Sequence, residues 1–182
     1  HDLKSFIQSD YQKDDLSEVV TQYSPKVVLP KINQVYSHAL TDVTFHKKKE
    51  AVVVIYHRVV DKPLTNSKFN VYITQDKLDW QLGSLKKRGF DFVTFKDLAK
   101  GVRVKKPIIL TFDDGYEDNY FNLLPLLKKY QAKAVIYCLG DRTAQSNTWD
   151  EKLGEPRARL MNDNQIKECH DSGLVEIASH GL

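Results

Sequence analysis

The sequence predicts an α/β fold built on a parallel sheet. Three observations support this prediction: apolar runs of strand length alternate with amphipathic segments, several of those segments carry helix-capping residues, and no repeat or low-complexity tract interrupts the alternation. The alternation starts near Glu50 and leaves two architectures open, a closed barrel or an open doubly wound sheet. Of the 182 residues, 41% are hydrophobic, which is enough for one globular domain with a core.

The first elements of this pattern lie between residues 51 and 95. Residues 51–57, AVVVIYH, form a β-branched run of strand length that we expect to be buried on both faces. We expect a helix next, because Thr74 suits the N-cap, leucines recur at helical spacing, and Gly89 follows the last basic residues. Residues 90–95, FDFVTF, then predict a further strand.

The remaining elements continue the alternation. The pattern predicts a short helix over residues 96–100, strands over 107–112, 132–139 and 174–180, and longer helices led by Pro125 and Asn162. Proline suits the first helical position, and Asn162 and Gln165 have the spacing of a capping box. The polar stretch 141–159 carries a glycine and a proline, so we expect a loop that lies over the site.

Charge and cysteine usage narrow the class of protein. The 27 basic and 24 acidic residues are interspersed and give a net charge of +3, which is typical of a solvated surface. The basic run 46–49 is short, so we expect a solvated turn and no nucleic-acid partner. Cys138 and Cys169 lack metal-knuckle or disulfide-scaffold spacing and are expected to be buried, unpaired thiols.

Four polar side chains stand where predicted strands end. His57 follows the first run, Asp113 and Asp114 follow residues 107–112, and His180 ends the last strand. Because the carboxyl ends of parallel strands form one face, we expect these side chains to share one mouth. Adjacent carboxylates repel one another unless a cation or a proton intervenes. The arrangement predicts metal-assisted hydrolysis, in which one aspartate binds the metal and the other accepts a proton.

Other interpretations of these residues stay open. An Asp-Asp-Gly sequence is often only a turn, with Gly115 supplying the tight backbone, and His57 is also typical of a hydrogen-bonded rim residue. Acidic clusters at strand ends also bind magnesium in phosphotransfer sites. The sequence has no glycine-rich phosphate loop, however, and a histidine ligand favours zinc, cobalt or nickel over magnesium.

Two stretches carry a resemblance to a known family. LTFDDGYEDN (residues 110–119) and MNDNQIKECHDSGLVEIASHGL (161–182), with NLLPLLKKYQAKAVIYCLG (122–140) between them, resemble the polysaccharide deacetylase superfamily, carbohydrate esterase family 4. VVVIYHRVVDKP (52–63) and FDFVTFKDL (90–98) look like the bacterial exopolysaccharide and cell-wall branch of that family. The resemblance covers residues 50–182 and leaves the start of the chain unmatched.

The resemblance implies a distorted (β/α)7 barrel that hydrolyses N-acetyl groups of N-acetylhexosamine residues in a bacterial cell-wall or surface polysaccharide. It implies a divalent metal, with Zn²⁺ favoured over Co²⁺ or Ni²⁺. By the match of motifs, Asp113 would be the general base, and Asp114 and His180 would be metal ligands. His57 and Tyr116 are expected to contact the substrate, and Trp149 and Tyr120 are further candidates for stacking on sugar rings.

The family pattern extends past this sequence. The second histidine ligand would fall two residues beyond Leu182, and the family's base-orienting arginine, acetyl-binding groove and general-acid histidine would follow. We therefore expect residues 49–182 to be the N-terminal part of a catalytic domain that needs the C-terminal part of the same protein for activity. Residues 1–48 are expected to form an extension or small subdomain.

The same resemblance carries expectations about cellular setting and about alternatives. We expect a monomer that acts outside the cell or at its surface. An N-terminal signal or membrane anchor, removed from the chain, would account for this location. A catalytically silent carbohydrate-binding relative and an O-acetyl esterase acting on a sugar polymer are the alternative functions.

Overall fold

A computed structural model describes residues 51–181 of the chain. The chain divides into two units, His1–Lys49 and Glu50–Leu182, and the fold below belongs to the second. The predicted extension, residues 1–48, lies outside the described residues. No helix within 51–181 is long and apolar enough to cross a membrane.

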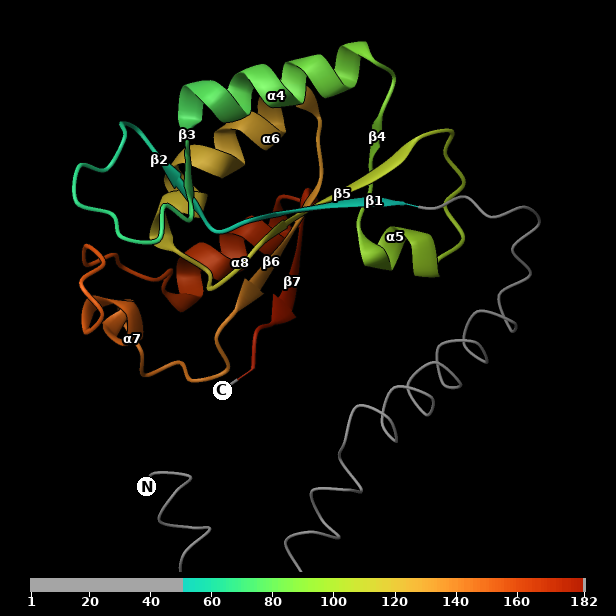
Figure 1. The fold of residues 1–182 in the computed structure, drawn as a ribbon. Helices are drawn as coiled ribbons and strands as arrows, with labels where there is room; N and C mark the ends of the chain where they lie inside the picture. The colour runs from blue at the N-terminus through green and yellow to red at the C-terminus, as the bar shows by residue number, and fades with distance from the viewer. Residues whose placement is uncertain (1–50, 182) are drawn as a thin grey trace, which may run out of the picture. The chain divides into compact units, whose positions relative to one another are not determined.

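A five-stranded parallel sheet forms the centre of the second unit (Figure 1). Its central strand β5 (Pro107–Phe112) pairs along one edge with β1 (Val52–Tyr56). Along the other edge, the start of β5 pairs with β4 (Asp91–Phe92) and its end pairs with β6 (Ala134–Cys138). β6 pairs in turn with β7 (Val175–Ser179). The predicted parallel sheet is therefore confirmed.

Helices alternate with these strands as the sequence predicts. They are α4 (Gln75–Lys87), α5 (Phe95–Ala99), α6 (Leu124–Tyr130), α7 (Thr148–Glu151) and α8 (Asp163–Asp171), with a π-helical turn η1 (Asn119–Leu123) directly before α6. The capping box of Asn162 and Gln165 is present at the start of α8, as predicted. The helix expected to be led by Pro125 starts earlier, because η1 runs directly into it.

A second, small parallel sheet was not predicted. β2 (Arg58–Val60) follows β1 after a single residue, His57, and pairs with β3 (Tyr72–Thr74). The break at His57 turns the chain out of the main sheet at the carboxyl end of β1. The loop between β2 and β3 therefore leaves from the same end of the sheet as the aspartates.

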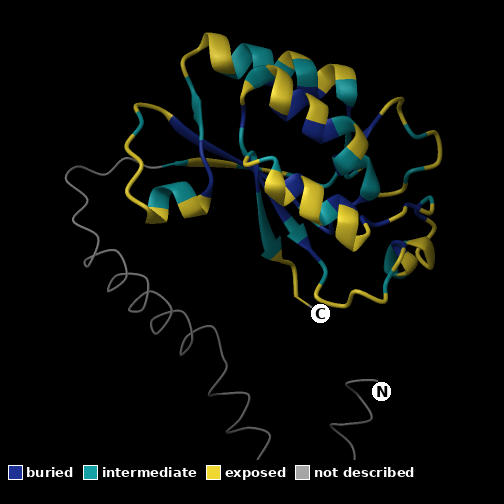
Figure 2. Cartoon of the chain, turned by 180° about the vertical axis from the view of Figure 1, so that it is seen from behind, coloured by how far each residue is buried: buried dark blue, intermediate teal, exposed yellow. Residues whose placement is uncertain are grey.

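The core lies on both faces of β5. Ile108, Leu110 and Phe112 pack in the larger cluster, with Leu78 and Leu82 of α4. α4 and α6 lie side by side over this face, and the helices turn buried residues inward and exposed residues outward (Figures 1 and 2). On the opposite face, a second cluster contains Ile109, Val93 and Val135. Cys138 and Cys169 are buried and unpaired, as predicted.

Two strand predictions are wrong in detail. β1 is not buried on both faces, since Val52, Val53 and Ile55 are 50%, 46% and 66% exposed. An apolar β-branched run predicts a strand but not its neighbours, and β1 is an edge strand in the described part of the chain. The strand predicted over residues 90–95 ends at Phe92, because Thr94 leaves the sheet to cap α5.

Candidate active site

The four polar side chains predicted to share one mouth do come together at the carboxyl ends of the strands. His57 Nε2 lies 3.9 Å from Asp113 Oδ2, and His180 Nε2 lies 3.8 Å from the same oxygen. His180 Nε2 also lies 3.8 Å from Asp114 Oδ1. The two histidines therefore flank Asp113, and His180 alone of the two has a close approach to Asp114.

An unusual backbone turn aims both carboxylates into this mouth. The Asp113 N–H donates to the Tyr56 carbonyl at 2.9 Å, which holds the end of β5 against the end of β1. Asp114 and Gly115 then both adopt left-handed conformations, with φ of +68° and +69°. A Cβ at residue 115 would lie 2.9 Å from Cys138 Sγ, so this position requires glycine for space as well as for φ.

Asp114 is a buried carboxylate that accepts no hydrogen bond within the described part of the chain. Its residue is only 8% exposed, and no hydrogen bond from residues 51–181 reaches it. Burial raises the pKa of Asp114, and the nearby imidazoles of His57 and His180 act in the opposite direction. A buried carboxylate that lacks donors is stabilised best by a cation, so this environment favours a metal ligand.

Asp114 and His180 fit one divalent metal ion. Their 3.8 Å separation is too long for a hydrogen bond. It is compatible with an oxygen and a nitrogen that each lie about 2.0–2.2 Å from the same zinc ion. No group of three or more histidine, cysteine or carboxylate side chains within 51–181 is arranged to hold an ion. The described pair would therefore supply only part of a coordination sphere.

Tyr116 does not lie in the mouth. Its residue is 1% exposed and packs with Ala158 and Leu160, while the Arg58 guanidinium carbon lies 5.4 Å from the centre of its ring. Burial raises the pKa of Tyr116 well above its ordinary value. The ring has no open face for a sugar, because core residues and Arg58 cover it.

The other two aromatic candidates are placed differently. The Tyr120 hydroxyl donates to Glu168 Oε2 at 2.6 Å, which ties this ring to α8. Trp149 is half-buried beside the Tyr116 cluster, within the excursion 141–159. That excursion was predicted to be a loop, and it contains the short helix α7.

Sequence reasoning missed three candidates, Arg58, Asp118 and Asn122, which form hydrogen bonds in the segment directly after His57. Asp118 Oδ2 accepts from Arg58 Nε at 2.9 Å, and Asp118 Oδ1 accepts from the Val59 N–H at 3.0 Å. Asn122 Nδ2 donates to the Val59 carbonyl at 2.7 Å. Burial raises the pKa of Asp118, and the Arg58 guanidinium opposes that shift. Arg58 and Asp118 both lie within the stretches that carry the family resemblance, and their opposite charges were the sequence signal for this contact.

A buried glutamate joins two loops that leave the strand ends. Glu155 is 5% exposed and accepts hydrogen bonds from Ser67 Oγ at 2.6 Å, the Lys68 N–H at 2.8 Å and the Phe69 N–H at 3.1 Å. Burial raises the pKa of Glu155, but these hydrogen bonds outweigh it, so the pKa lies below its ordinary value. The loop between β2 and β3 is thus fixed to the excursion 141–159.

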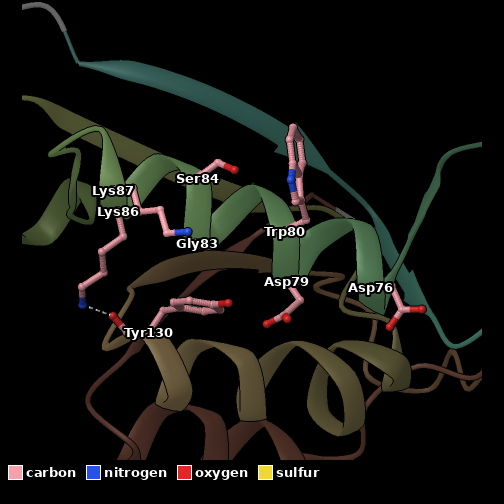
Figure 3. Close-up of a pocket in the computed structure, with 8 residues that line it drawn as sticks. All are labelled: Asp76, Asp79, Trp80, Gly83, Ser84, Lys86, Lys87 and Tyr130. Atoms are coloured by element: carbon pink, nitrogen blue, oxygen red, sulfur yellow. Dashed lines mark hydrogen bonds between the residues drawn. The ribbon is translucent and has the colours of Figure 1, made fainter.

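A separate surface hollow lies between α4 and α6 (Figure 3). It has a volume of about 580 Å³, and its rim includes Trp80, whose residue is 70% exposed. In Figure 3 the Lys86 side chain reaches the Tyr130 carbonyl across its lower part. None of the four mouth residues lines this hollow, so it is distinct from the candidate active site.

One family model matches the part of the chain that carries the paired aspartates. Residues 100–182 match the model for polysaccharide deacetylase. The match includes the turn with Asp113 and Asp114 and extends through the strand that precedes His180.

The curated relatives are named as deacetylases of poly-β-1,6-N-acetyl-D-glucosamine. A poly-β-1,6-N-acetyl-D-glucosamine N-deacetylase of Escherichia coli K12 is 28% identical over 137 residues, which cover 71% of this chain and 20% of that protein. The Staphylococcus epidermidis protein of the same name is 27% identical over 149 residues, which cover 74% of this chain and 49% of that protein. The chain therefore spans about a fifth and about half of the lengths of these curated relatives.

Solved structures share the fold. A de-N-acetylase from Aggregatibacter actinomycetemcomitans superposes with a TM-score of 0.59 at 28% identity and covers 71% of this chain and 54% of that one. IcaB from Ammonifex degensii superposes with a TM-score of 0.57 at 28% identity, and the match covers 74% of this chain and 54% of that one. These neighbours confirm the predicted barrel-type α/β fold, of which the described sheet is a part.

Proposed function

We propose that the protein containing this chain is a metal-dependent hydrolase that removes N-acetyl groups from N-acetylhexosamine residues of a bacterial surface polysaccharide. The observation that carries this proposal is the meeting of Asp113, Asp114 and His180 within 3.8 Å contacts at the strand ends of a polysaccharide deacetylase fold. The names of the relatives make β-1,6-linked N-acetylglucosamine the first polymer to test.

Asp114 and His180 would hold the metal ion, and Zn²⁺ suits this carboxylate and imidazole pair best, with Co²⁺ or Ni²⁺ as substitutes. When bound, the ion would supply Lewis-acid chemistry by lowering the pKa of water and polarising the acetyl carbonyl. The Asp114 carboxylate is buried and accepts no hydrogen bond from residues 51–181, which supports its role as a ligand. Further ligands would come from the C-terminal part of the same protein.

Asp113 would act as the general base. It is less buried than Asp114, with a side chain 21% exposed against 11%, and it stands between the two histidines. Asp113 would accept a proton from water as the water oxygen bonds to the acetyl carbon. The carbon–nitrogen bond then breaks and the nitrogen gains a proton, which yields acetate and a free amine.

His57 would contact the substrate. Its Nε2 lies 3.9 Å from Asp113 Oδ2, and its side chain is 30% exposed. An imidazole in this place can hydrogen-bond the amide or a neighbouring hydroxyl of the sugar. Tyr116, the other residue predicted to bind substrate, would act only indirectly, through the Arg58 side chain above its ring.

We further propose that the protein is a monomer that acts outside the cell or on its surface. Surface polysaccharide is found there, and deacetylation would convert neutral amides of the polymer into cationic amines. The alternative functions are a silent carbohydrate-binding relative and an O-acetyl esterase, and both use the same mouth.

The test is acetate release by the full-length protein from three substrates: β-1,6-linked N-acetylglucosamine oligomers, the same oligomers carrying O-acetyl groups, and an oligomer already deacetylated. Faster release from N-acetyl than from O-acetyl groups supports the proposal. The reverse order would make the protein an esterase, and tight oligomer binding without any acetate release would make it a binding protein.

A further inference from the structure

We infer that Asp118 and Asn122 are positioning residues that hold His57 beside Asp113. This inference rests on the proposed function, because it assigns these two side chains a part in the same mouth. Neither residue lies among the strand-end groups, and both come from the segment that follows the Asp113-Asp114 turn.

The first support is the hydrogen bonding of Val59. Val59 is fully buried, so its backbone N–H and carbonyl both need partners. The neighbouring Arg58 N–H donates to the Val71 carbonyl, which lies just before β3 in the same chain. Val59 instead donates to Asp118 at 3.0 Å and accepts from Asn122 at 2.7 Å. Two side chains thus cover the edge of β2 that faces away from β3.

The second support is the ion pair of Arg58, the residue directly after His57. Its Nε donates to Asp118 at 2.9 Å, and the two side chains are only 12% and 16% exposed. Its guanidinium also lies over the buried Tyr116 ring. One carboxylate therefore holds both residues that follow His57, one through its side chain and one through its backbone.

The third support is the fastening before His57. The Tyr56 carbonyl accepts from the Asp113 N–H at 2.9 Å, so the chain is attached on both sides of the histidine. Every one of these attachments comes from the segment 113–122, which also carries the paired aspartates. The distance from His57 Nε2 to Asp113 Oδ2, 3.9 Å, is therefore set by contacts within one local unit.

A purely structural role would have a different signature. Removing one partner of a largely buried ion pair leaves the other charge unpaired, so in a purely structural role Asp118→Ala would lower stability without lowering turnover. Asp97 provides a matched control, since its side chain is 17% exposed, pairs with Lys133 at 2.8 Å and caps α5 away from His57. Both aspartates join a basic side chain to a backbone N–H, although Lys133 is more exposed than Arg58, at 36% against 12%.

The experiment uses the full-length protein with Asp118→Ala, Asp118→Asn and Asp97→Ala. Asp118→Ala should lower kcat for acetate release by about 10- to 100-fold with KM and zinc content unchanged, because displacements of about 1 Å can cost that much. Asp118→Asn keeps an acceptor for the Val59 N–H and should recover most of the loss. Asp97→Ala should lower the melting temperature without lowering kcat. Wild-type kcat in Asp118→Ala, or an equal loss in Asp97→Ala, would overturn the inference.

A second readout does not depend on acetate release. The rate at which diethyl pyrocarbonate modifies His57, mapped by mass spectrometry, should rise several-fold in Asp118→Ala while the exposed His170 reacts at an unchanged rate. An unchanged rate at His57 would refute the positioning role. A wild-type protein that releases no acetate but shows the faster reaction in the variant would refute the proposed function and keep the positioning of His57.

Discussion

His57 and His180 stand almost equally far from Asp113, at 3.9 and 3.8 Å, yet the chain holds them in different ways. The strand end of His180 is joined to the next strand by backbone hydrogen bonds, from the His180 N–H to the Cys138 carbonyl and from the Gly140 N–H to the Gly181 carbonyl. The strand end of His57 also has a backbone hydrogen bond, from the Asp113 N–H to the Tyr56 carbonyl, and is held in addition by the side chains of Asp118 and Asn122.

This difference helps to assign separate roles to His57 and His180, which their nearly equal distances to Asp113 do not distinguish. His180 also faces the buried Asp114, so it belongs with the proposed metal ligands. His57 has its close contact with Asp113, at 3.9 Å, and the ion pair of Arg58 with Asp118 fixes the strand end after it. We therefore propose that one histidine of the pair is a metal ligand and that the other contacts the substrate.

The largest expected effect concerns the carboxylate that both histidines share. Asp113→Asn should lower kcat by about 100- to 10,000-fold, because it removes the proposed general base while keeping the size of the side chain. Zinc content, measured by elemental analysis of the purified full-length variant, should stay at the wild-type level. Full turnover in this variant would remove Asp113 from the base role.

Next, the two histidines should separate in metal affinity. His180→Ala should weaken zinc binding by more than about 100-fold, since loss of even an outer partner of a ligand costs about 10- to 100-fold. His57→Ala should leave zinc affinity within a few-fold of wild type while it lowers turnover. Competition titration with a chromogenic chelator gives both affinities, and equal losses in the two variants would contradict the division of roles.

The turn that places Asp113 between the histidines should be sensitive to one added methyl group. Gly115→Ala should destabilise the fold by about 1–3 kcal/mol. The new Cβ would collide with Cys138, and the alanine backbone would have to keep a positive φ. Urea unfolding would measure this change. The control is Gly154→Ala. Gly154 also has a positive φ, but no atom lies within 4 Å of the added Cβ, so this substitution should lower the free energy of unfolding by less. Equal losses would show that φ alone matters at residue 115.

The smallest effect should come from the loop contact beyond His57. The pKa of Glu155 is lowered in the folded state, so its ionised form adds stability above the ordinary glutamate pKa, and that stability is lost as pH falls through the lower folded value. Glu155→Gln should cost about 1–2 kcal/mol at pH 7. The gap to wild type should narrow at acid pH in urea titrations, whereas a gap that widens on acidification would contradict this sign.

The mouth could be predicted from the sequence because strand ends in parallel sheets share a face. That rule needs only the apolar runs before His57, Asp113 and His180, and these runs are plain in the sequence. The burial of β1 was mispredicted, since the pattern of Val52–Tyr56 does not reveal which strands stand beside it.

The supports beneath the mouth could not be predicted in this way. The bonds from Asp118 and Asn122 to Val59 join residues that are about 60 positions apart, and side chain to backbone contacts leave no periodic signal. The same limit applies to Tyr116, because a tyrosine after Asp-Asp-Gly can point into the mouth or into the core. Only the packing of Ala158 and Leu160 against its ring decides between them.

The most direct test of the central claim, that Asp114 and His180 hold a metal that serves deacetylation, is reconstitution of the full-length protein. Acetate release from β-1,6-linked N-acetylglucosamine oligomers is measured after the metal has been removed and again after one equivalent of Zn²⁺ has been added. The account predicts loss of activity on removal and its return with one equivalent in wild type, without return in His180→Ala. Acetate release that persists in the metal-free protein would contradict it.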